Sequence, residues 1–372
     1  MARRLLAGLA GVALLSMGAA ALLATARPVA VAAVGDRVLA VYALAGRTWL
    51  LPLAPRAAWA VPLPGGPVAL APARFGERPG LFLVAGGEMQ ALVLPGDAPP
   101  QRLAGALSGA LAPPQRLAGA AAPPGVQRVL AADLDGDGTD ELLLLGGSPP
   151  PPAQGRPGLS AGLQVWQLAG GGLRPLWQGL EPYDPWQLAA GPVGGGLALA
   201  VGTWTRAVYD PQWAERLWLY RWREGQPDAL WLGSRLAHPF RDFTLAPQAP
   251  GESALLVALE AARGGGETLS LYRWNGFGFT LDYTAPDWQR VLAFAALPPA
   301  PGCATLAAVV EPGPTLVLLA LPAADGPLIT LVRRTLPAAD GPEVAAARGH
   351  LWLLAGGRLH RFDTCRPAAG SP

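Results

Sequence analysis

The stretch Val129–Gly147, VLAADLDGDGTDELLLLGG, carries the clearest chemical signal in the chain. Asp133, Asp135 and Asp137 stand at alternate positions, and the glycines beside them allow the backbone to fold tightly around one point. Three carboxylates held this close repel one another unless a cation lies between them. Hard oxygen ligands of this kind suit Ca²⁺ better than a transition metal.

The spacing also indicates which atoms would bind the cation. In calcium loops that begin this way, positions 1, 3 and 5 give side-chain oxygens and position 7 gives a backbone carbonyl, here Thr139. An EF-hand needs a glutamate at position 12, which is Leu144, and the flanking runs Val129–Ala132 and Leu142–Leu145 are typical of short buried strands. The loop closes earlier, with Glu141 at position 9. We expect one Ca²⁺, held by Asp133, Asp135, Asp137, the Thr139 carbonyl and Glu141. The alternative is an Asp/Gly turn without a metal.

A strand, a DxDGDGxxE loop and a second strand resemble the calcium-binding blade motif of FG-GAP and VCBS repeat β-propellers, which are related to the integrin α head. The match covers about 18 residues, and elsewhere the resemblance is one of pattern. The aspartate that this family has at the ninth position is Glu141 here. The resemblance implies a calcium-binding propeller of the bacterial exported type.

Composition limits the function classes. The chain has 372 residues, 51% of them hydrophobic, which is enough to bury a large core. Only 15% are charged and the net charge is +2, which argues against nucleic acid or an anionic membrane surface as partner. The 48 glycines and 41 prolines accompany many apolar residues, so they indicate short strands joined by turns rather than disorder.

Residues 1–26 form a targeting segment. Arg3 and Arg4 precede an uncharged apolar run that ends in Ala24-Thr25-Ala26, a small-residue cleavage pattern. The run is also long enough to cross a bilayer as a hydrophobic helix. We therefore expect an exported protein, either secreted after cleavage or anchored to the membrane through this segment alone.

The remainder predicts a repeat protein. Each unit has an apolar strand, a loop and a second apolar strand, and several units add a glycine-turned hairpin, which makes a four-stranded sheet. The first strands align on Leu70, Leu130, Leu188, Leu245, Leu292 and Val344, at intervals of 47 to 60 residues. With a unit before Leu70, residues 27–365 form an all-β, seven-bladed propeller, and 366–372 form a tail. Six blades are the alternative, and two β-sandwich domains would need a longer period.

Three further expectations follow from the unit pattern. The last unit has only three strands, so we expect the N-terminal strand to close the ring by pairing with it. APPQRLAGA occurs at both 98–106 and 112–120, and we interpret both copies as loop insertions. Other units replace DLDGDG with GPVGGG, PQAPGE or PPAPGC, so the calcium loop should occur once.

The two cysteines lie in different units. In an exported protein an even number of cysteines indicates a disulfide. Cys303 lies in the first loop of the sixth unit, and Cys365 follows the third strand of the seventh unit. If successive strands alternate in direction, both positions lie on the same face of the propeller. We expect a Cys303–Cys365 bond that holds the C-terminus, and two free buried thiols are the alternative.

The opposite face collects polar and aromatic segments. Its longest loop connects the second and third strands of the fourth unit, and Arg and aromatic residues there are typical interface anchors. The candidate ligand-binding residues are Trp204, Arg206, Tyr209, Asp210 and Trp213. The alternative is that these aromatics pack between blades.

The chain shows no catalytic signature such as GxSxG or a phosphate-binding loop. We expect an exported, monomeric, non-enzymatic module that binds a protein or a glycan at the cell envelope. The alternatives are a polysaccharide lyase or hydrolase built on a propeller, and a scaffold for envelope assembly, since the fold does not decide among them.

Overall fold

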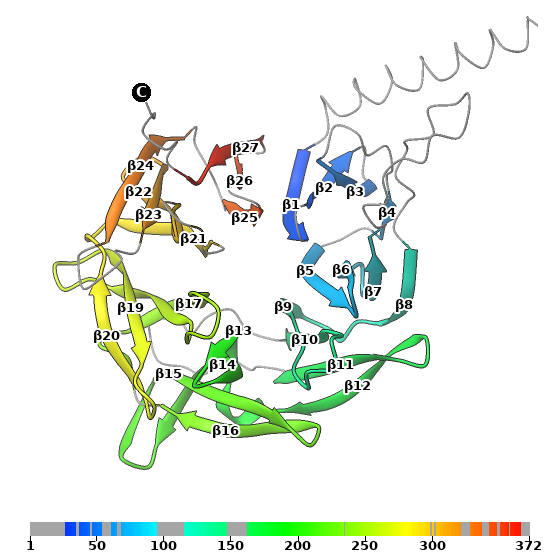
Figure 1. The fold of residues 1–372 in the computed structure, drawn as a ribbon, viewed down its shortest axis with the longest axis horizontal. Coiled ribbons are helices and arrows are strands. Elements are labelled where there is room, and N and C mark those ends of the chain that lie inside the picture. Colours follow the sequence, from blue (N-terminus) through cyan, green and yellow to red (C-terminus); the bar gives the residue numbers. More distant parts are fainter. Residues whose placement is uncertain are drawn as a thin grey trace, which may run out of the picture.

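Strands β1 to β27 form seven antiparallel sheets, which succeed one another around a ring (Figure 1). The computed structural model describes residues 27–34, 37–44, 47–53, 61–64, 68–94, 115–146, 162–233, 235–297, 300, 303–320, 328–336, 342–347, 350–356 and 358–365. We number the sheets as blades 1 to 7 in chain order. This arrangement confirms the seven-bladed propeller predicted from the repeat.

Blade 1 contains β1 (Arg27–Val34), β2 (Arg37–Leu44), β3 (Arg47–Pro52) and β4 (Val61–Leu63), and blade 2 contains β5 (Val68–Phe75), β6 (Arg78–Ala85), β7 (Glu88–Val93) and β8 (Gln115–Ala121). Blade 3 contains β9 (Val126–Ala132), β10 (Glu141–Gly146), β11 (Leu163–Ala169) and β12 (Gly172–Gly179). After the short 3-10 turn η1 (Glu181–Tyr183), blade 4 contains β13 (Pro185–Val193), β14 (Gly196–Ala207), β15 (Asp210–Arg223) and β16 (Gln226–Leu232).

Blade 5 contains β17 (Phe240–Ala246), β18 (Leu255–Ala261), β19 (Glu267–Trp274) and β20 (Phe279–Thr284). Blade 6 contains β21 (Arg290–Ala296), β22 (Leu306–Glu311), β23 (Thr315–Ala320) and β24 (Ile329–Thr335). Blade 7 contains β25 (Glu343–Ala347), β26 (His350–Ala355) and β27 (Arg358–Asp363).

The core lies between neighbouring blades. The second strand of a blade is buried on both faces because a sheet packs against each side of it, and in β10 the run Leu142–Leu145 is at most 2% exposed. The outermost strands, such as β8 and β16, are mostly exposed. Within the described residues, six hydrophobic clusters join successive blades from 1 to 7. The apolar second strand of a blade therefore contributes to two interfaces, one with the preceding blade and one with the following blade.

The ring does not close by strand exchange, which corrects our expectation. The N-terminal strand β1 pairs with β2 in its own sheet, and blade 7 keeps three strands in the order β25-β26-β27. β1 instead lies beside β25 and β26, and the backbone N–H of Val31 donates to Glu343 Oε2 at 3.2 Å. Blade 1 uses all four of its own strands, so β1 has a partner and is not free to complete blade 7.

The duplicated segment was also misread in part. Residues 115–120 of its second copy belong to β8, the outer strand of blade 2, where Ala118 is buried against the core. The strand was hard to recognise because four of its seven residues are small and only Ala118 is fully buried. The first copy, 98–106, lies outside the described residues.

Two other expectations concern residues that the structure does not describe. The targeting segment 1–26 and the tail 366–372 both lie outside the described residues. Among the residues it does describe, no helix is long and apolar enough to cross a membrane.

Candidate functional site

The predicted calcium loop joins β9 to β10 at one face of the ring. The carboxylate oxygens of Asp133, Asp135 and Asp137 come within 4.8 Å of one another. Gly136 and Gly138 have φ values of 80° and 89°, a region that other residues rarely adopt. No atom lies within 4 Å of a Cβ built on either glycine, so backbone conformation, not lack of space, favours glycine there.

The loop satisfies most of these carboxylates with its own backbone. The N–H of Gly138 donates to Asp133 Oδ2 at 3.1 Å, that of Asp137 to Asp135 Oδ1 at 3.1 Å, and that of Thr139 to Asp137 Oδ1 at 2.6 Å. The second oxygen of Asp133, Oδ1, is buried and has no hydrogen-bond partner. An unpaired buried carboxylate oxygen beside two other carboxylates fits a cation.

Glu141 lies apart from this group of three. Its side chain is 3% exposed, and Oε2 accepts a hydrogen bond from the backbone N–H of Leu134 at 2.8 Å. Burial, with a smaller contribution from the charges of Asp135 and Asp137, raises the pKa of Glu141 to about 7, although the hydrogen bond from Leu134 opposes the shift. The structure thus brings together three of the predicted ligands and uses the fourth carboxylate to brace the loop.

Two residues that sequence reasoning missed tie the loop to blade 2. Arg74, near the end of β5, binds Asp133 Oδ2 through its guanidinium at 3.0 Å. Its backbone N–H donates to Asp140 Oδ2 at 2.7 Å, and the N–H of Asp140 donates back to the Arg74 carbonyl at 2.8 Å. When Leu70 is aligned with Leu130 in the sequence, Arg74 falls opposite the start of the loop. This alignment is the sequence signal that could have identified Arg74 as a neighbour of the loop.

The second candidate site is the hairpin of β14 and β15, which are 12 and 14 residues long. Pairing continues to Ala207 and Asp210, with one register shift between Thr205 and Ala207, so the hairpin is a two-stranded ribbon up to its turn. The turn residues Val208 and Tyr209 are 106% and 67% exposed. This ribbon presents an aliphatic and an aromatic side chain to solvent.

The aromatic residues nearer the base of the hairpin have a different role. Trp204 is 7% exposed and belongs to the core between blades 4 and 5, which corrects its assignment to the ligand-binding surface. Trp213 packs partly against the same core, and the guanidinium of Arg206 lies 5.0 Å from the centre of its ring. The alternative of aromatics between blades is therefore right for Trp204, whereas Arg206 and Tyr209 are exposed.

Two arginines fix the hairpin through Asp210. Arg216 is 1% exposed and donates to Asp210 Oδ2 at 2.9 Å and to the Thr205 carbonyl at 3.2 Å. Arg235, from the connection between blades 4 and 5, donates to both Asp210 carboxylate oxygens at 2.8 and 3.1 Å. The hydrogen bonds from Arg216 and then Arg235 lower the pKa of Asp210. Asp210 thus has a structural role. Its ion pairs hold the β14–β15 hairpin next to the connection between blades 4 and 5.

A polar cluster inside the ring was not predicted at all. Gln187 of β13 donates from Nε2 to Asp242 Oδ1 of β17, and Arg128 of β9 lies 3.9 Å from Asp242 Oδ2. Burial raises the pKa of Asp242, although Arg128 opposes the shift. These residues come from first strands of successive blades, so only the ring geometry brings them together.

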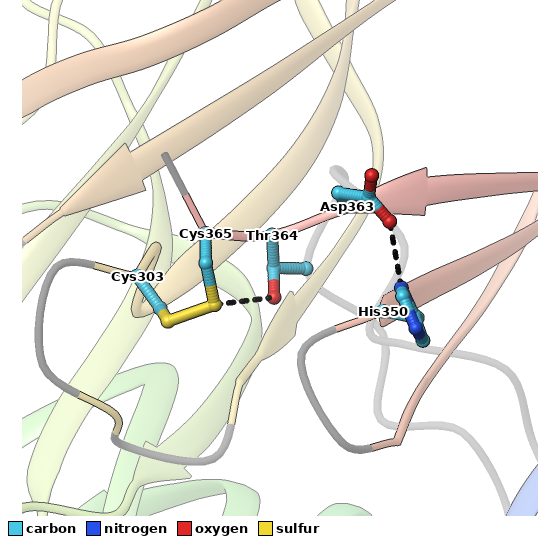
Figure 2. Close-up of a disulfide and its surroundings, with 5 residues drawn as sticks. All are labelled: Cys303, His350, Asp363, Thr364 and Cys365. Atoms are coloured by element: carbon cyan, nitrogen blue, oxygen red, sulfur yellow. Dashed lines mark hydrogen bonds and ion pairs between the residues drawn. A yellow bond between two sulfur atoms is a disulfide. The ribbon is translucent and has the colours of Figure 1, made fainter. Parts of the chain in front are cut away.

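Cys303 and Cys365 are joined by a disulfide in the structure, with Cα atoms 3.8 Å apart (Figure 2). The backbone N–H of Ala304 also donates to the Thr364 carbonyl at 2.8 Å. The end of the chain after β27 is therefore held against the loop between β21 and β22, where the alternation of strands placed it.

The comparisons agree on the fold and reach no further. No protein-family model and no curated protein matches the chain. Sqt1 of Saccharomyces cerevisiae is similar with a TM-score of 0.54 and 12% identity, over 91% of this chain and 83% of that one. A chain of the Mitotic Checkpoint Complex gives a TM-score of 0.50 and 14% identity over 88% and 87%. A candidate 6-phosphogluconolactonase from Bacteroides uniformis gives 0.49 and 13% over 85% and 87%. Identities this low show a shared fold alone. The chain is a seven-bladed β-propeller.

Proposed function

We propose that this propeller is an exported, non-enzymatic module that binds a protein or a glycan at the cell envelope through the tip of the β14–β15 hairpin. The observation that carries the proposal is the exposed tip of this hairpin. Val208 and Tyr209 are exposed at 106% and 67%, while the buried Arg216 fixes the ribbon beneath them. An exposed aromatic on a preorganised support loses little entropy on binding.

The fold class is consistent with a binding role. One of the similar structures is a chain of the Mitotic Checkpoint Complex, and a complex is held together by contacts between its members. A lyase or hydrolase is the competing function, and the cluster of Arg128, Gln187 and Asp242 is the observation in its favour. That cluster brings one carboxylate, whereas glycoside hydrolysis usually needs a pair. Binding is therefore the function that the described residues support better.

The test is retention of envelope proteins and glycans on the immobilised chain. Arg206→Ala combined with Tyr209→Ala should abolish retention and leave the free energy of unfolding within about 1 kcal/mol of wild type, as exposed substitutions usually do. Phe277→Ala is the matched control, because Phe277 is 79% exposed in the β19–β20 turn at the other face. Retention that survives the double substitution would contradict the proposal.

We also propose that Asp133, Asp135, Asp137, the Thr139 carbonyl and Glu141 hold one Ca²⁺. The unpaired Asp133 Oδ1 and the convergence of three carboxylates support a cation there. Glu141 would have to release the Leu134 N–H or bind through its other oxygen. The ion would fix the loop against blade 2 and replace the internal bonds that now satisfy the aspartates. It has no part in binding at the hairpin.

Thermal melts with EGTA and with excess Ca²⁺ test this site. With an affinity of about 10⁻⁴–10⁻³ M, typical of extracellular modules, Ca²⁺ at about 100 times its dissociation constant should stabilise the fold by about 2.7 kcal/mol. The variant Asp135→Ala with Asp137→Ala should melt at the same temperature with and without the ion. If EGTA and Ca²⁺ give identical melts for wild type, the loop is a metal-free turn.

A further inference from the structure

Blade 7 has an uncovered edge strand. Six of the seven sheets have four strands, and in each the third strand is covered by a fourth, whereas blade 7 ends at β27 (Figure 1). Within the described residues β27 pairs with β26 and with no other strand of a sheet. Its outer side therefore presents backbone N–H and C=O groups that a further strand could bind.

A groove lies along this edge, between β27 and the outer strand β24 of blade 6. It consists of two overlapping hollows of about 370 and 410 Å³, which share Arg334, Arg361 and Phe362. Leu318 of β23 and Val332 of β24 add apolar surface, and Val332 is 38% exposed. The groove is thus lined by residues of the uncovered strand β27 on one side and of the outer strand of blade 6 on the other.

The charges that line the groove are unbalanced. The guanidinium of Arg334 lies 5.4 Å from the centre of the Phe362 ring, and that of Arg361 lies 5.9 Å from the Trp352 ring. The one carboxylate among the lining residues, Asp363, is already paired with His350 Nδ1 at 2.8 Å (Figure 2). Arg361 also lies 2.8 Å from His350 Nε2, so it is linked to the Asp363 carboxylate only through this histidine. Within the described residues neither Arg334 nor Arg361 forms a direct ion pair with a carboxylate, and these two exposed guanidinium groups favour an acidic occupant.

We propose that an extended acidic segment of another protein binds in this groove as the fourth strand of blade 7. A strand edge selects a peptide backbone by hydrogen bonding, and the pocket side chains select its residues. The ends of this chain do not suit the groove, because residues 1–26 and 366–372 contain arginine and no acidic residue. A second copy paired edge to edge would bring the arginines of two β27 strands together. This surface is distinct from the β14–β15 hairpin and does not depend on the function proposed for it.

The probe is a synthetic seven-residue peptide in which valine and glutamate alternate, titrated against the intact chain by fluorescence anisotropy. We expect saturable binding that weakens as salt is raised, because the arginine contacts are exposed. The same peptide with lysine in place of glutamate should bind at least tenfold more weakly. A peptide N-methylated at alternate amides keeps the charges and loses backbone donors, and it should also bind at least tenfold more weakly.

Substitutions locate the site. Arg334→Glu with Arg361→Glu should reverse the preference to the lysine peptide, whereas Arg333→Glu should preserve it, since Arg333 is exposed on β24 but does not line the groove. Unchanged melting temperatures show that both proteins are folded. If the double variant fails to fold, the N-methylated peptide still decides the matter on the wild-type chain. Absence of binding, equal binding of the two charge types, insensitivity to N-methylation, or a concentration-dependent dimer that displaces the peptide would each overturn the proposal.

Discussion

At the scale of single residues, Arg216 shows how a polar side chain can form part of a propeller's interior. It lies in β15, whose neighbouring buried positions are apolar, and it is 1% exposed. Its Nε and Nη2 atoms donate to the Thr205 carbonyl, to Asp210 and to the Gln212 carbonyl, whereas Nη1 is buried without a hydrogen-bond partner, so hydrogen bonds compensate its burial in part. The arginine couples the turn of the hairpin to the core beneath it.

Replacing Arg216 by methionine should therefore destabilise the chain by about 2 kcal/mol, since several hydrogen bonds are lost while apolar volume is kept. Urea unfolding followed by tryptophan fluorescence measures the change. Arg235→Met is the comparison, because Arg235 binds the same carboxylate from a side chain that is 44% exposed. That substitution should cost less than about 1 kcal/mol. Equal effects of the two substitutions would mean that burial of Arg216 is not what matters.

Asp242 gives a pH-dependent prediction. Burial raises its pKa above the ordinary value of 3.8, so its contribution to stability is complete below that value and is lost as the pH rises through the folded-state pKa. Asp242→Asn removes this titration. The stability of wild type relative to this variant should therefore fall as the pH rises from 4 towards neutrality, as measured by urea unfolding at several pH values. A difference that is constant with pH would show that Arg128 and Gln187 fully offset the burial.

At the scale of elements, strongly apolar strands were predictable and weakly apolar ones were not. The residues used to align the units, from Leu70 to Val344, all lie in the first strand of their blades. The alignment was possible because strands that pack between two sheets consist of recognisable apolar runs. β8 was missed because its small residues show little of the hydrophobic pattern that identifies a strand. The three aspartates of the predicted calcium loop are local in sequence and were found, whereas Arg74, Arg216 and Asp242 act through contacts between strands or blades that no local pattern records.

The tandem copies permit a test of β8. Deleting residues 98–111 leaves every residue of β8, including the pairing of Ala91 with Ala118. The shorter connection should change the free energy of unfolding by no more than about 1 kcal/mol, because loop-closure entropy varies slowly with length. In the deleted chain, Ala118→Asp should lower the melting temperature strongly, since Ala118 is buried. A large loss from the deletion alone would mean that the first copy has a structural role.

At the scale of the whole molecule, the disulfide and the missing strand both concern the end of the ring. Blade 7 is held to blade 6 by the hydrophobic cluster they share and by the bond between Cys303 and Cys365. On its other side it meets blade 1 without sharing a strand, through contacts such as that of Val31 with Glu343. Blade 7 therefore depends more on its covalent link than a four-stranded blade would.

Reduction of the disulfide should lower the free energy of unfolding by about 2–4 kcal/mol, the usual range for a long closed loop, and here the two cysteines are 62 residues apart. Denaturant unfolding with and without dithiothreitol measures this. Cys303→Ser with Cys365→Ser should reproduce the effect and make it independent of the reductant. Hydrogen exchange should then show the largest loss of protection in β25, β26 and β27. No difference between oxidised and reduced chains would show that the cysteines do not pair in solution.

The absence of strand exchange bears on how such a ring can change over evolutionary time. Every one of the seven sheets is built from a single unbroken stretch of chain, from β1–β4 to β25–β27. A gene segment that encodes one sheet is therefore a complete module, and its duplication or loss cuts no sheet in two. A ring closed by a shared strand would tie its first and last modules together and fix both ends. Here the chain could be opened between any two blades and rejoined between β27 and β1 with all seven sheets intact.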